Sequence, residues 1–249
     1  MTTAQTSGTQ THRVSILIPV FNERLWLPKM LEKLQHPALR ATYASLNWVL
    51  ELIIIDDGSS DGTRQWLETW TPTQDPQRVR AIYLPKNMGK GAAIRAGLKL
   101  ATGDVIAIQD ADLEYDPADY PPLIQLVMDG YADAVYGTRL VPGKPVRAFN
   151  IWHYWGNQFL SLATNVLFNT TLTDMETGCK IFRADLLKSL PLRAHRFEFE
   201  PEVTALLLKR GARLYEAPIS YHGRNFDEGK KIRWVDGFWA LWTLLKCRL

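Results

Sequence analysis

The chain has 249 residues, of which 46% are apolar and 22% charged, as is usual for a globular protein with a sizeable core. Its 29 basic and 26 acidic side chains give a net charge of +3, too small an excess to indicate nucleic-acid binding. Cys179 and Cys247 lie far apart without a surrounding Cys or His pattern, so neither a disulfide framework nor a zinc site is indicated, and a reducing, cytoplasmic setting is the default.

Residues 1–12 are rich in Thr, Gln and Ser and contain no apolar segment, so we interpret them as a disordered leader and not as a signal peptide. No later stretch approaches the roughly 18 apolar residues that a membrane-spanning helix needs. The most apolar stretch, residues 151–168, is interrupted by polar side chains. The sequence therefore predicts no spanning helix.

Apolar runs predict strands at residues 14–20, 48–56, 79–84, 104–109 and 133–137. They alternate with predicted helices at residues 23–35, 62–70, 88–101 and 117–129. This alternation is typical of a mostly parallel sheet flanked by helices, here in one domain over residues 13–225. The alternation stops after Arg139, where an aromatic-rich stretch leads into helical and loop segments.

Polar residues follow the first two predicted strands at the point where each strand ends. The first is followed by Phe21, Asn22 and Glu23, and the second by the segment Asp56-Asp57-Gly58-Ser59-Ser60-Asp61-Gly62-Thr63. Helix capping needs only one of the three acids in that segment. Ligands of open α/β sheets bind at the carboxyl ends of the strands, where acids can accept hydrogen bonds from a base and a ribose. These segments therefore predict a nucleotide-binding crevice.

A glycine segment, Asn87-Met88-Gly89-Lys90-Gly91, lies at the start of the third predicted helix. It lacks the first glycine and the final Ser or Thr of a phosphate-binding P-loop. One interpretation is a helix start whose free amides face an anion, with Lys90 adding charge. The alternative is a purely structural turn.

The segment Gln109-Asp110-Ala111-Asp112 follows the fourth predicted strand, and Glu114 comes two residues later. Carboxylates spaced in this way can share Mg2+ or Mn2+, which prefer oxygen ligands, and such a cation can hold a diphosphate. We expect Asp112 and Glu114 to be ligands and Asp110 to be either a ligand or a ribose contact. The alternative is a set of solvated loop carboxylates.

Taken together, these motifs resemble the family 2 glycosyltransferases of GT-A fold, in particular the branch of dolichol- and polyprenyl-phosphate hexose synthases. The resemblance covers roughly residues 13–225 and implies an α/β, Rossmann-like nucleotide-diphospho-sugar transferase fold. It also implies a nucleotide-sugar half at residues 13–139 and an acceptor half at residues 140–225. The matching segments are Ile18-Pro19-Val20-Phe21-Asn22-Glu23, Ile55 to Thr63, Asn87 to Ala93, Gln109 to Glu114, and Gly137-Thr138-Arg139.

The resemblance further implies a metal-dependent, inverting transfer of a hexose from GDP-mannose or UDP-glucose to a polyprenyl or dolichyl phosphate. The residues expected to contact the nucleotide sugar are Pro19, Phe21, Glu23, Asp56, Asp57, Lys90, Asp110 and Ala111. Cations expected around the acceptor phosphate are Arg139, Lys180, Arg183 and Arg224. Where these synthases typically have Ser-Gly-Phe-Arg, the chain has Thr177-Gly178-Cys179-Lys180, and lysine cannot reproduce the two-pronged hydrogen bonding of arginine to phosphate.

A sugar hydroxyl or another hydroxyl is the alternative acceptor, and it would need a carboxylate base. Asp174 and Glu176 are the first candidates because they adjoin Lys180, and acids between residues 198 and 202 are further ones. The latter can equally be the acidic first turn of a helix. The candidate catalytic residues are therefore Asp112, Arg139, Asp174 and Glu176.

The tail, residues 226–249, interleaves Trp, Phe and Leu with Lys and Arg. Such a segment can lie as an amphipathic helix in the surface of a membrane, which would give peripheral attachment to the cytoplasmic face. The alternatives are a terminal helix packed on its own domain or on a second subunit of a homo-oligomer.

Two other classes of protein deserve comparison. A sugar nucleotidyltransferase would need a glycine-rich phosphate loop after the first strand, where this chain has Pro19-Val20-Phe21. A non-catalytic nucleotide-sugar-binding protein would share the binding residues. The presence of Asp110, Asp112 and Arg139 favours an enzyme.

Overall fold

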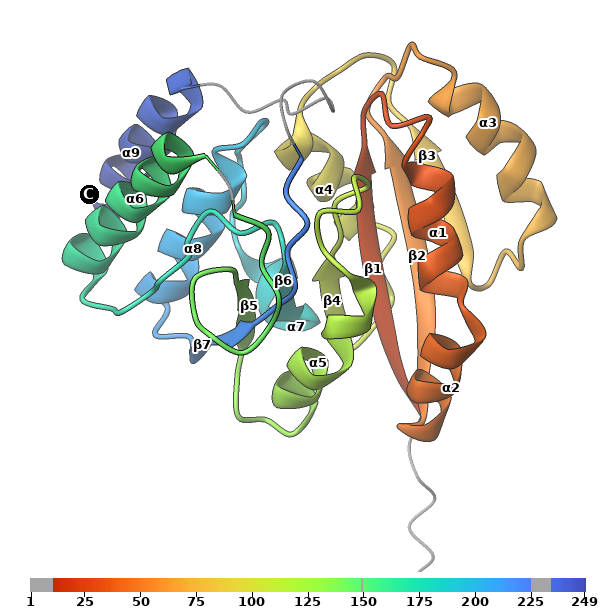
Figure 1. Cartoon of the computed structure of the whole chain (residues 1–249), viewed down its shortest axis with the longest axis horizontal. Coiled ribbons are helices and arrows are strands. Elements are labelled where there is room, and N and C mark those ends of the chain that lie inside the picture. The colour runs from red at the N-terminus through yellow and green to blue at the C-terminus, as the bar shows by residue number, and fades with distance from the viewer. Residues whose placement is uncertain (1–10, 149, 225–233) are drawn as a thin grey trace, which may run out of the picture.

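A seven-stranded sheet forms the centre of the computed structural model, which describes residues 11–148, 150–224 and 234–249 (Figure 1). The sheet order is β3-β2-β1-β4-β6-β5-β7, and only β6 runs antiparallel to its neighbours. The strands are β1 (His12–Val20), β2 (Trp48–Asp56), β3 (Val79–Tyr83), β4 (Val105–Ile108), β5 (Ala134–Thr138), β6 (Lys180–Arg183) and β7 (Leu214–Pro218). The five predicted strands are present within two residues at each end, and the predicted α/β, mostly parallel architecture is confirmed.

Two strands, β6 and β7, lie beyond Arg139, where the sequence predicted helices and loops only. β6 has four residues, of which only Ile181 and Phe182 are apolar, so it lacks a recognisable run. It forms a strand because β4 and β5 pair with it on both sides. The residues after Arg139 therefore contribute a strand to the middle of the sheet.

The helices of the described residues are α1 (Leu27–Gln35), α2 (Pro37–Ser45), α3 (Thr63–Trp70), α4 (Lys90–Leu98), α5 (Tyr120–Met128), α6 (Ile151–Phe168), α7 (Ala184–Ser189), α8 (Phe199–Lys209) and α9 (Trp234–Arg248), with short 3-10 turns at Thr71–Thr73 and Pro117–Asp119. The sequence did not predict α2. His36 has extended backbone angles that end α1, and its side chain accepts the N–H of Ala38, while Pro37 occupies the first turn of α2.

Helices cover both faces of the sheet (Figure 1). α1, α2 and α5 pack on one face in a core that includes Ile54, and α4, α7 and α8 pack on the other with Ile106. Full burial of one such side chain contributes about 1.5–3 kcal/mol to folding. α6 and α9 lie outside α8, where Leu160, Ala205 and Leu244 form a third cluster.

The register of the sheet brings distant segments to one edge. Val20 is paired with Asp56 at the carboxyl ends of β1 and β2, and Ile108 at the end of β4 is paired with Lys180. Because β6 is antiparallel, its first residue lies at the same edge as the last residues of β1, β2, β4 and β5. This edge carries the candidate site.

None of the helices that the structure describes is both long and apolar enough to cross a membrane. Of the predicted leader, residues 1–10 lie outside the described residues, as do residues 226–233 of the predicted tail. The described part of the tail forms α9.

Candidate active site

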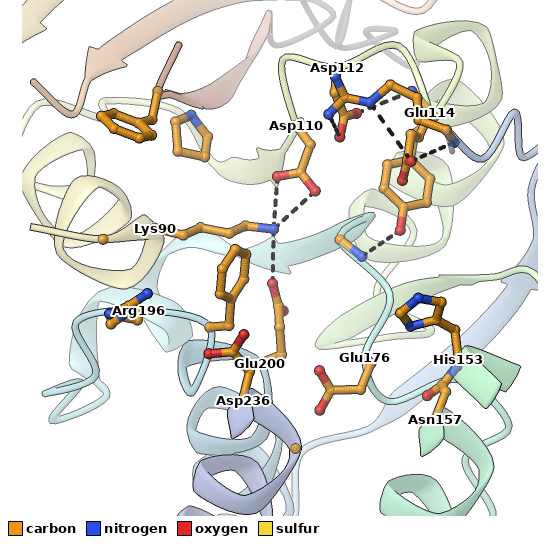
Figure 2. Close-up of a pocket in the computed structure, with 18 of the residues that line it drawn as sticks. Lys90, Asp110, Asp112, Glu114, His153, Asn157, Glu176, Arg196, Glu200 and Asp236 are labelled. Carbon is orange, nitrogen blue, oxygen red and sulfur yellow. Dashed lines mark hydrogen bonds and ion pairs between the residues drawn. The ribbon is translucent and has the colours of Figure 1, made fainter. Parts of the chain in front are cut away.

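A pocket of about 770 Å3 opens at the carboxyl edge of the sheet, between the strand ends and the first turns of α6 and α9 (Figure 2). Most of the residues predicted for the site line it. They are Pro19, Phe21, Glu23, Asp57, Lys90, Asp110, Ala111, Asp112, Glu114, Arg139, Glu176 and Arg224. Asp56, Asp174, Lys180 and Arg183 are not among the lining residues.

The two acids that end β2 have different positions. Asp56 is buried, does not line the pocket, and accepts hydrogen bonds from Arg64 Nε at 2.7 Å and from the backbone N–H of Ser59 at 3.3 Å, so it links the loop after β2 to α3. Asp57 lines the pocket and accepts the backbone N–H groups of Met88 (2.8 Å) and Gly89 (2.7 Å). Burial raises the pKa of the Asp57 carboxyl despite these hydrogen bonds.

Four backbone N–H groups at the start of α4 already have acceptors within the protein and are not available to an anion. Besides the two N–H groups that Asp57 accepts, those of Gly91 and Ala92 donate to the backbone carbonyls of Arg196 and His195. A Cβ atom on Gly89, whose φ is +95°, would lie 2.5 Å from the carbonyl oxygen of His195. Glycine is required here for close packing between two loops.

Lys90 belongs to a partly buried chain of four alternating charges. Its Nζ atom lies 2.7 Å from Asp110 Oδ1 and 3.0 Å from Glu200 Oε1, and Glu200 Oε2 lies 2.7 Å from Lys180 Nζ (Figure 2). Burial opposes the charge on Lys90, but Asp110 and Glu200 outweigh it and raise the Lys90 pKa. The pocket thus retains a fixed cation next to Asp110 at neutral pH.

Arg224 occupies the other acidic part of the pocket. Its Nη2 donates to Asp112 Oδ2 at 2.9 Å and its Nη1 to Glu23 Oε2 at 3.1 Å. Its backbone N–H donates to Glu114 Oε1 at 2.8 Å, and Tyr221 donates its hydroxyl to the other Glu114 oxygen at 3.0 Å. The residue predicted to bind the acceptor is therefore paired with carboxylates predicted to bind metal and donor.

The three-carboxylate metal site predicted at Asp110, Asp112 and Glu114 is not preformed. Within residues 11–148, 150–224 and 234–249, no group of three or more His, Cys, Asp or Glu side chains is arranged to hold a metal. Asp110 is directed to Lys90, and Glu114 to Tyr221 and Arg224. The donor chemistry still fits, because Mg2+ is commonly held by one or two carboxylates together with substrate phosphates.

The acidic side chains around Asp112 support the fit of a cation at this position. Burial raises the pKa of the Asp112 carboxyl, and Glu114 and Glu23 raise it further against the effect of Arg224. A cation held by Asp112 would relieve this repulsion.

Arg139 and Asp174 form a pair joined by two hydrogen bonds, both of 2.7 Å, and Asp174 also accepts the backbone N–H of Arg139. Asn157 donates to the same carboxylate at 2.7 Å. Burial would raise the pKa of Asp174, but Arg139 outweighs it and the pKa is lowered. Asp174 is completely buried behind the pocket, so it positions Arg139 and is not placed to act as a base.

Glu176 is the candidate base that lines the pocket. Its Oε1 atom is buried and has no hydrogen-bond partner among the described residues. Burial, reinforced by the charge of Glu200, raises the pKa of Glu176 to about 7. Figure 2 shows its carboxylate directed toward the side of Glu200 and away from His153.

The remaining two predicted acceptor cations do not reach the pocket. Lys180 is completely buried, where its ammonium group contacts Glu200, donates to the carbonyls of Met175 and Thr177, and lies over the Tyr136 ring. Arg183 pairs with Asp133 and Asp185 at the opposite end of β6. A separation of three residues along a strand spans roughly 10 Å, which places Arg183 away from the site.

Glu200, one of the further candidate bases, also lines the pocket, and several lining residues were not predicted as site residues: Trp152, His153, Asn157, Arg196 and Asp236. His153 and Asn157 interrupt the apolar stretch of α6 at a four-residue spacing, which places them on one helix face. That spacing could have identified both residues from the sequence. Arg196 and Asp236 stand in no motif, so no signal identified them.

Exposed apolar stripes run along α6 and α9, which pack against each other (Figure 1). The exposed side chains are Ile151, Trp152, Trp155, Phe159, Leu162 and Val166 on α6, and Phe238, Trp239, Trp242 and Leu245 on α9. The other side of α9 is buried through Ala240 and Leu244. Trp152, Phe159 and Phe238 also line the pocket, so one end of the pocket joins these stripes.

The family model for glycosyl transferase family 2 matches residues 15–190. Over 219 residues the chain is 30% identical to the undecaprenyl-phosphate 4-deoxy-4-formamido-L-arabinose transferase of Pseudomonas fluorescens, an alignment covering 88% of this chain and 59% of that protein. It is 29% identical over 255 residues to the undecaprenyl-phosphate mannosyltransferase of Micrococcus luteus, covering 95% and 99% of the two chains.

A solved structure of similar fold is the glucosyl-3-phosphoglycerate synthase of Mycobacterium tuberculosis in complex with Mn2+, UDP-glucose and phosphoglyceric acid. Its TM-score is 0.68 at 19% identity, covering 95% of this chain and 80% of that one. This likeness confirms the GT-A-like fold, and the family match covers well over half of the sequence. The chain therefore belongs to glycosyl transferase family 2, where it resembles the undecaprenyl-phosphate sugar transferases, as the motifs predicted.

Proposed function

We propose that the protein transfers a hexose from a nucleotide-diphosphate sugar to a polyprenyl phosphate, with inversion at the anomeric carbon. The observation that carries this proposal is the pocket itself, which is charged at the strand ends and apolar where it joins the α6 and α9 stripes. Such a pocket suits a polar donor and a lipid-linked acceptor. The names of the relatives, which act on undecaprenyl phosphate, support the same acceptor.

The donor would occupy the charged end, next to the segments that follow β1, β2 and β4. Phe21 and Asp57 line this end of the pocket and would contact the nucleoside. GDP-mannose and UDP-glucose are the two candidate donors. Lys90 would compensate phosphate charge. Mg2+ or Mn2+ held by Asp112, with Glu114 or Asp110, would neutralise the diphosphate as it leaves the sugar. The solved relative with Mn2+ and UDP-glucose supports this use of a cation.

The acceptor would enter from the apolar end. A lipid phosphate is already an anion, so its oxygen can attack the anomeric carbon without a strong base, provided that it is positioned and its charge is compensated. The new bond forms from the phosphate oxygen to carbon, while the bond from that carbon to the diphosphate breaks. Arg139, held rigidly by Asp174, and Arg196 line the pocket and can compensate the acceptor charge.

The α6 and α9 stripes would contact the membrane surface that carries the lipid. Trp and Phe side chains favour the headgroup level, and Lys246 and Arg248 in the last turn of α9 suit anionic lipid. We propose peripheral contact at the cytoplasmic face of the membrane. A second copy of the chain covering the stripes is the homo-oligomer alternative.

A hydroxyl acceptor is the second candidate, and the position of Glu176 favours it. A carboxylate with a pKa of about 7 that lines the pocket has the properties of a general base. In that case the base would take the hydroxyl proton as the oxygen attacks.

The test follows nucleoside diphosphate release from GDP- and UDP-sugars with Mn2+ or Mg2+, with and without a short polyprenyl phosphate. Release that requires the lipid supports the proposal and identifies the donor. Release that requires a hydroxyl acceptor instead makes Glu176→Gln the next variant. No release with any donor would contradict the enzymatic proposal and favour a nucleotide-sugar-binding protein.

A further inference from the structure

Arg224 is unusual because it is an almost buried guanidinium, 9% exposed, within a group of acids that come from distant parts of the chain. Glu23 follows β1, Asp112 and Glu114 follow β4, and Arg224 follows β7. The guanidinium joins Glu23 to Asp112 at 3.1 and 2.9 Å. It is therefore the cation on which these carboxylates converge in this structure.

Both oxygens of Asp112 and both oxygens of Glu114 already accept hydrogen bonds. Asp112 Oδ1 accepts the backbone N–H of Glu114 at 3.1 Å, and Oδ2 accepts Arg224 Nη2. Glu114 Oε1 accepts the backbone N–H of Arg224, and Oε2 accepts the Tyr221 hydroxyl. Arg224 thus supplies a donor to each of the two carboxylates expected to bind a cation.

We propose that Arg224 is a resident counter-cation that competes with the divalent cation for Asp112. The metal and the guanidinium need the same carboxylate charge, and two cations held side by side at one carboxylate repel each other. Binding of the metal therefore requires Arg224 Nη2 to leave Asp112 Oδ2. This inference rests on the proposed metal-dependent function.

The competition has a consequence for the order of binding. Without a donor, the guanidinium keeps the acids paired and weakens metal binding. A nucleoside diphosphate supplies both further oxygen ligands for the metal and an anion for the released guanidinium, because arginine binds phosphate through two parallel hydrogen bonds. Metal and nucleotide should therefore strengthen each other's binding, and Arg224 should carry part of that coupling.

The test is Mn2+ binding to the full-length protein without nucleotide, measured by the paramagnetic resonance signal of free Mn2+. Arg224→Gln should bind Mn2+ about tenfold more tightly than the unsubstituted chain, the effect expected for removal of one competing charge-assisted hydrogen bond. Arg224→Lys, which keeps the charge, should lie between them. Addition of GDP or UDP should tighten Mn2+ binding less in Arg224→Gln than in the unsubstituted chain.

Arg213→Gln is the matched control, because it removes the same charge from a guanidinium paired with Asp133 at the far end of the sheet. An equal gain in Mn2+ affinity in both Gln variants would show that the effect comes from net charge alone, and would overturn the proposal. Unchanged or weaker Mn2+ binding in Arg224→Gln would overturn it as well, and would make Arg224 an aid to metal binding. A melting-temperature scan distinguishes a change in Mn2+ affinity from misfolding. If the variant is folded, Mn2+ should raise the melting temperature of Arg224→Gln more than that of the unsubstituted chain.

The binding assay needs no turnover, so its result stands apart from the donor and acceptor panel. Turnover with unchanged Mn2+ affinity in Arg224→Gln would contradict only the competition. Tighter Mn2+ binding in that variant without turnover in the panel would contradict only the proposed transfer reaction.

Discussion

The two ends of the pocket are held in different ways. At the charged end, ion pairs fix several side chains, such as Lys90 between Asp110 and Glu200. At the apolar end, the helices α6 and α9 are fixed by one buried side while the other carries exposed aromatic rings, with Trp152 79% exposed. The charged end is therefore preorganised internally, whereas the apolar end presents surface that suits an external apolar phase.

This difference separates residues that act on the reaction from residues that hold the site or anchor the protein. Asp112 belongs to the first group, Asp174 to the second and the α6 and α9 stripes to the third. Substitution in each group should therefore change a different measurement.

The largest expected effect is that of Asp112→Ala on turnover. Loss of this carboxylate should lower metal-dependent nucleoside diphosphate release by about 100-fold or more, because ligand and transition-state charge compensation are lost together. The fold should persist, since the Asp112 side chain is 17% exposed at the sheet edge. Release assays and circular dichroism check both expectations.

The exposed acid Asp129, which directly follows α5, provides the control, as Asp129→Ala should retain full release. Unchanged release by Asp112→Ala would remove the assigned metal role of this carboxylate.

Asp174→Ala should instead reduce stability, by about 3–5 kcal/mol, because it leaves the Arg139 charge buried and unpaired. Urea unfolding measures this loss. Asp185→Ala breaks the exposed pair with Arg183, in which the Asp185 side chain is 72% exposed, and should cost less than about 1 kcal/mol. A stable but inactive Asp174→Ala variant would restore Asp174 as a candidate base.

A double substitution, Trp155→Glu with Trp242→Glu, should weaken binding to anionic lipid vesicles by about tenfold or more, since two exposed rings no longer enter the interface. Vesicle co-sedimentation provides the measurement. Leu25→Glu with Tyr131→Glu is the matched control, because both residues are exposed away from α6 and α9. Equal losses in the two double variants would argue against membrane contact through the stripes, and sedimentation equilibrium would then test their burial between two copies.

The smallest expected effect concerns pH and Glu176, whose pKa is about 7 against an ordinary 4.5. Between these values the folded chain binds more protons at this group than the unfolded chain does. The contribution of Glu176 to stability is therefore complete below about pH 4.5 and is lost as the pH rises through about 7. Glutamine does not titrate, so Glu176→Gln does not lose stability in this way. The free energy of unfolding of Glu176→Gln, relative to that of the unsubstituted chain, should therefore increase between pH 5 and pH 8.

Urea midpoints at these two pH values measure that difference, and Glu32→Gln on the exposed side of α1 is the control. A difference that stays constant with pH would show that Glu176 does not titrate in this range.

Strands that consist of an apolar run were predictable, and strands without such a run were not. β2 contains Leu52-Ile53-Ile54-Ile55, which identifies it at once, whereas β6 depends on neighbours that pair with it on both sides. Local propensity carries no information about such pairing. The polar segments at the strand ends could be located as well, because each of them directly follows an apolar run.

The partners of the site residues could not be predicted. Arg224 and Asp112 are 112 residues apart in the chain, and Arg139 and Asp174 are 35 apart. A single sequence shows which charges exist but does not show which of them meet. For that reason four cations were equally plausible around the acceptor, of which Lys180 and Arg183 are bound elsewhere.

The central position of β6 also bears on how such a protein is synthesised and recombined. As the chain leaves the ribosome, β4 and β5 are complete before the strand that separates them exists, so the sheet cannot close until the later half has been made. For the same reason, a chimera joined after residue 139 would insert a foreign strand into the middle of the native sheet. Exchange of acceptor specificity between relatives should therefore proceed through the loops and outer helices, with β6 kept from the parent that supplies β4 and β5.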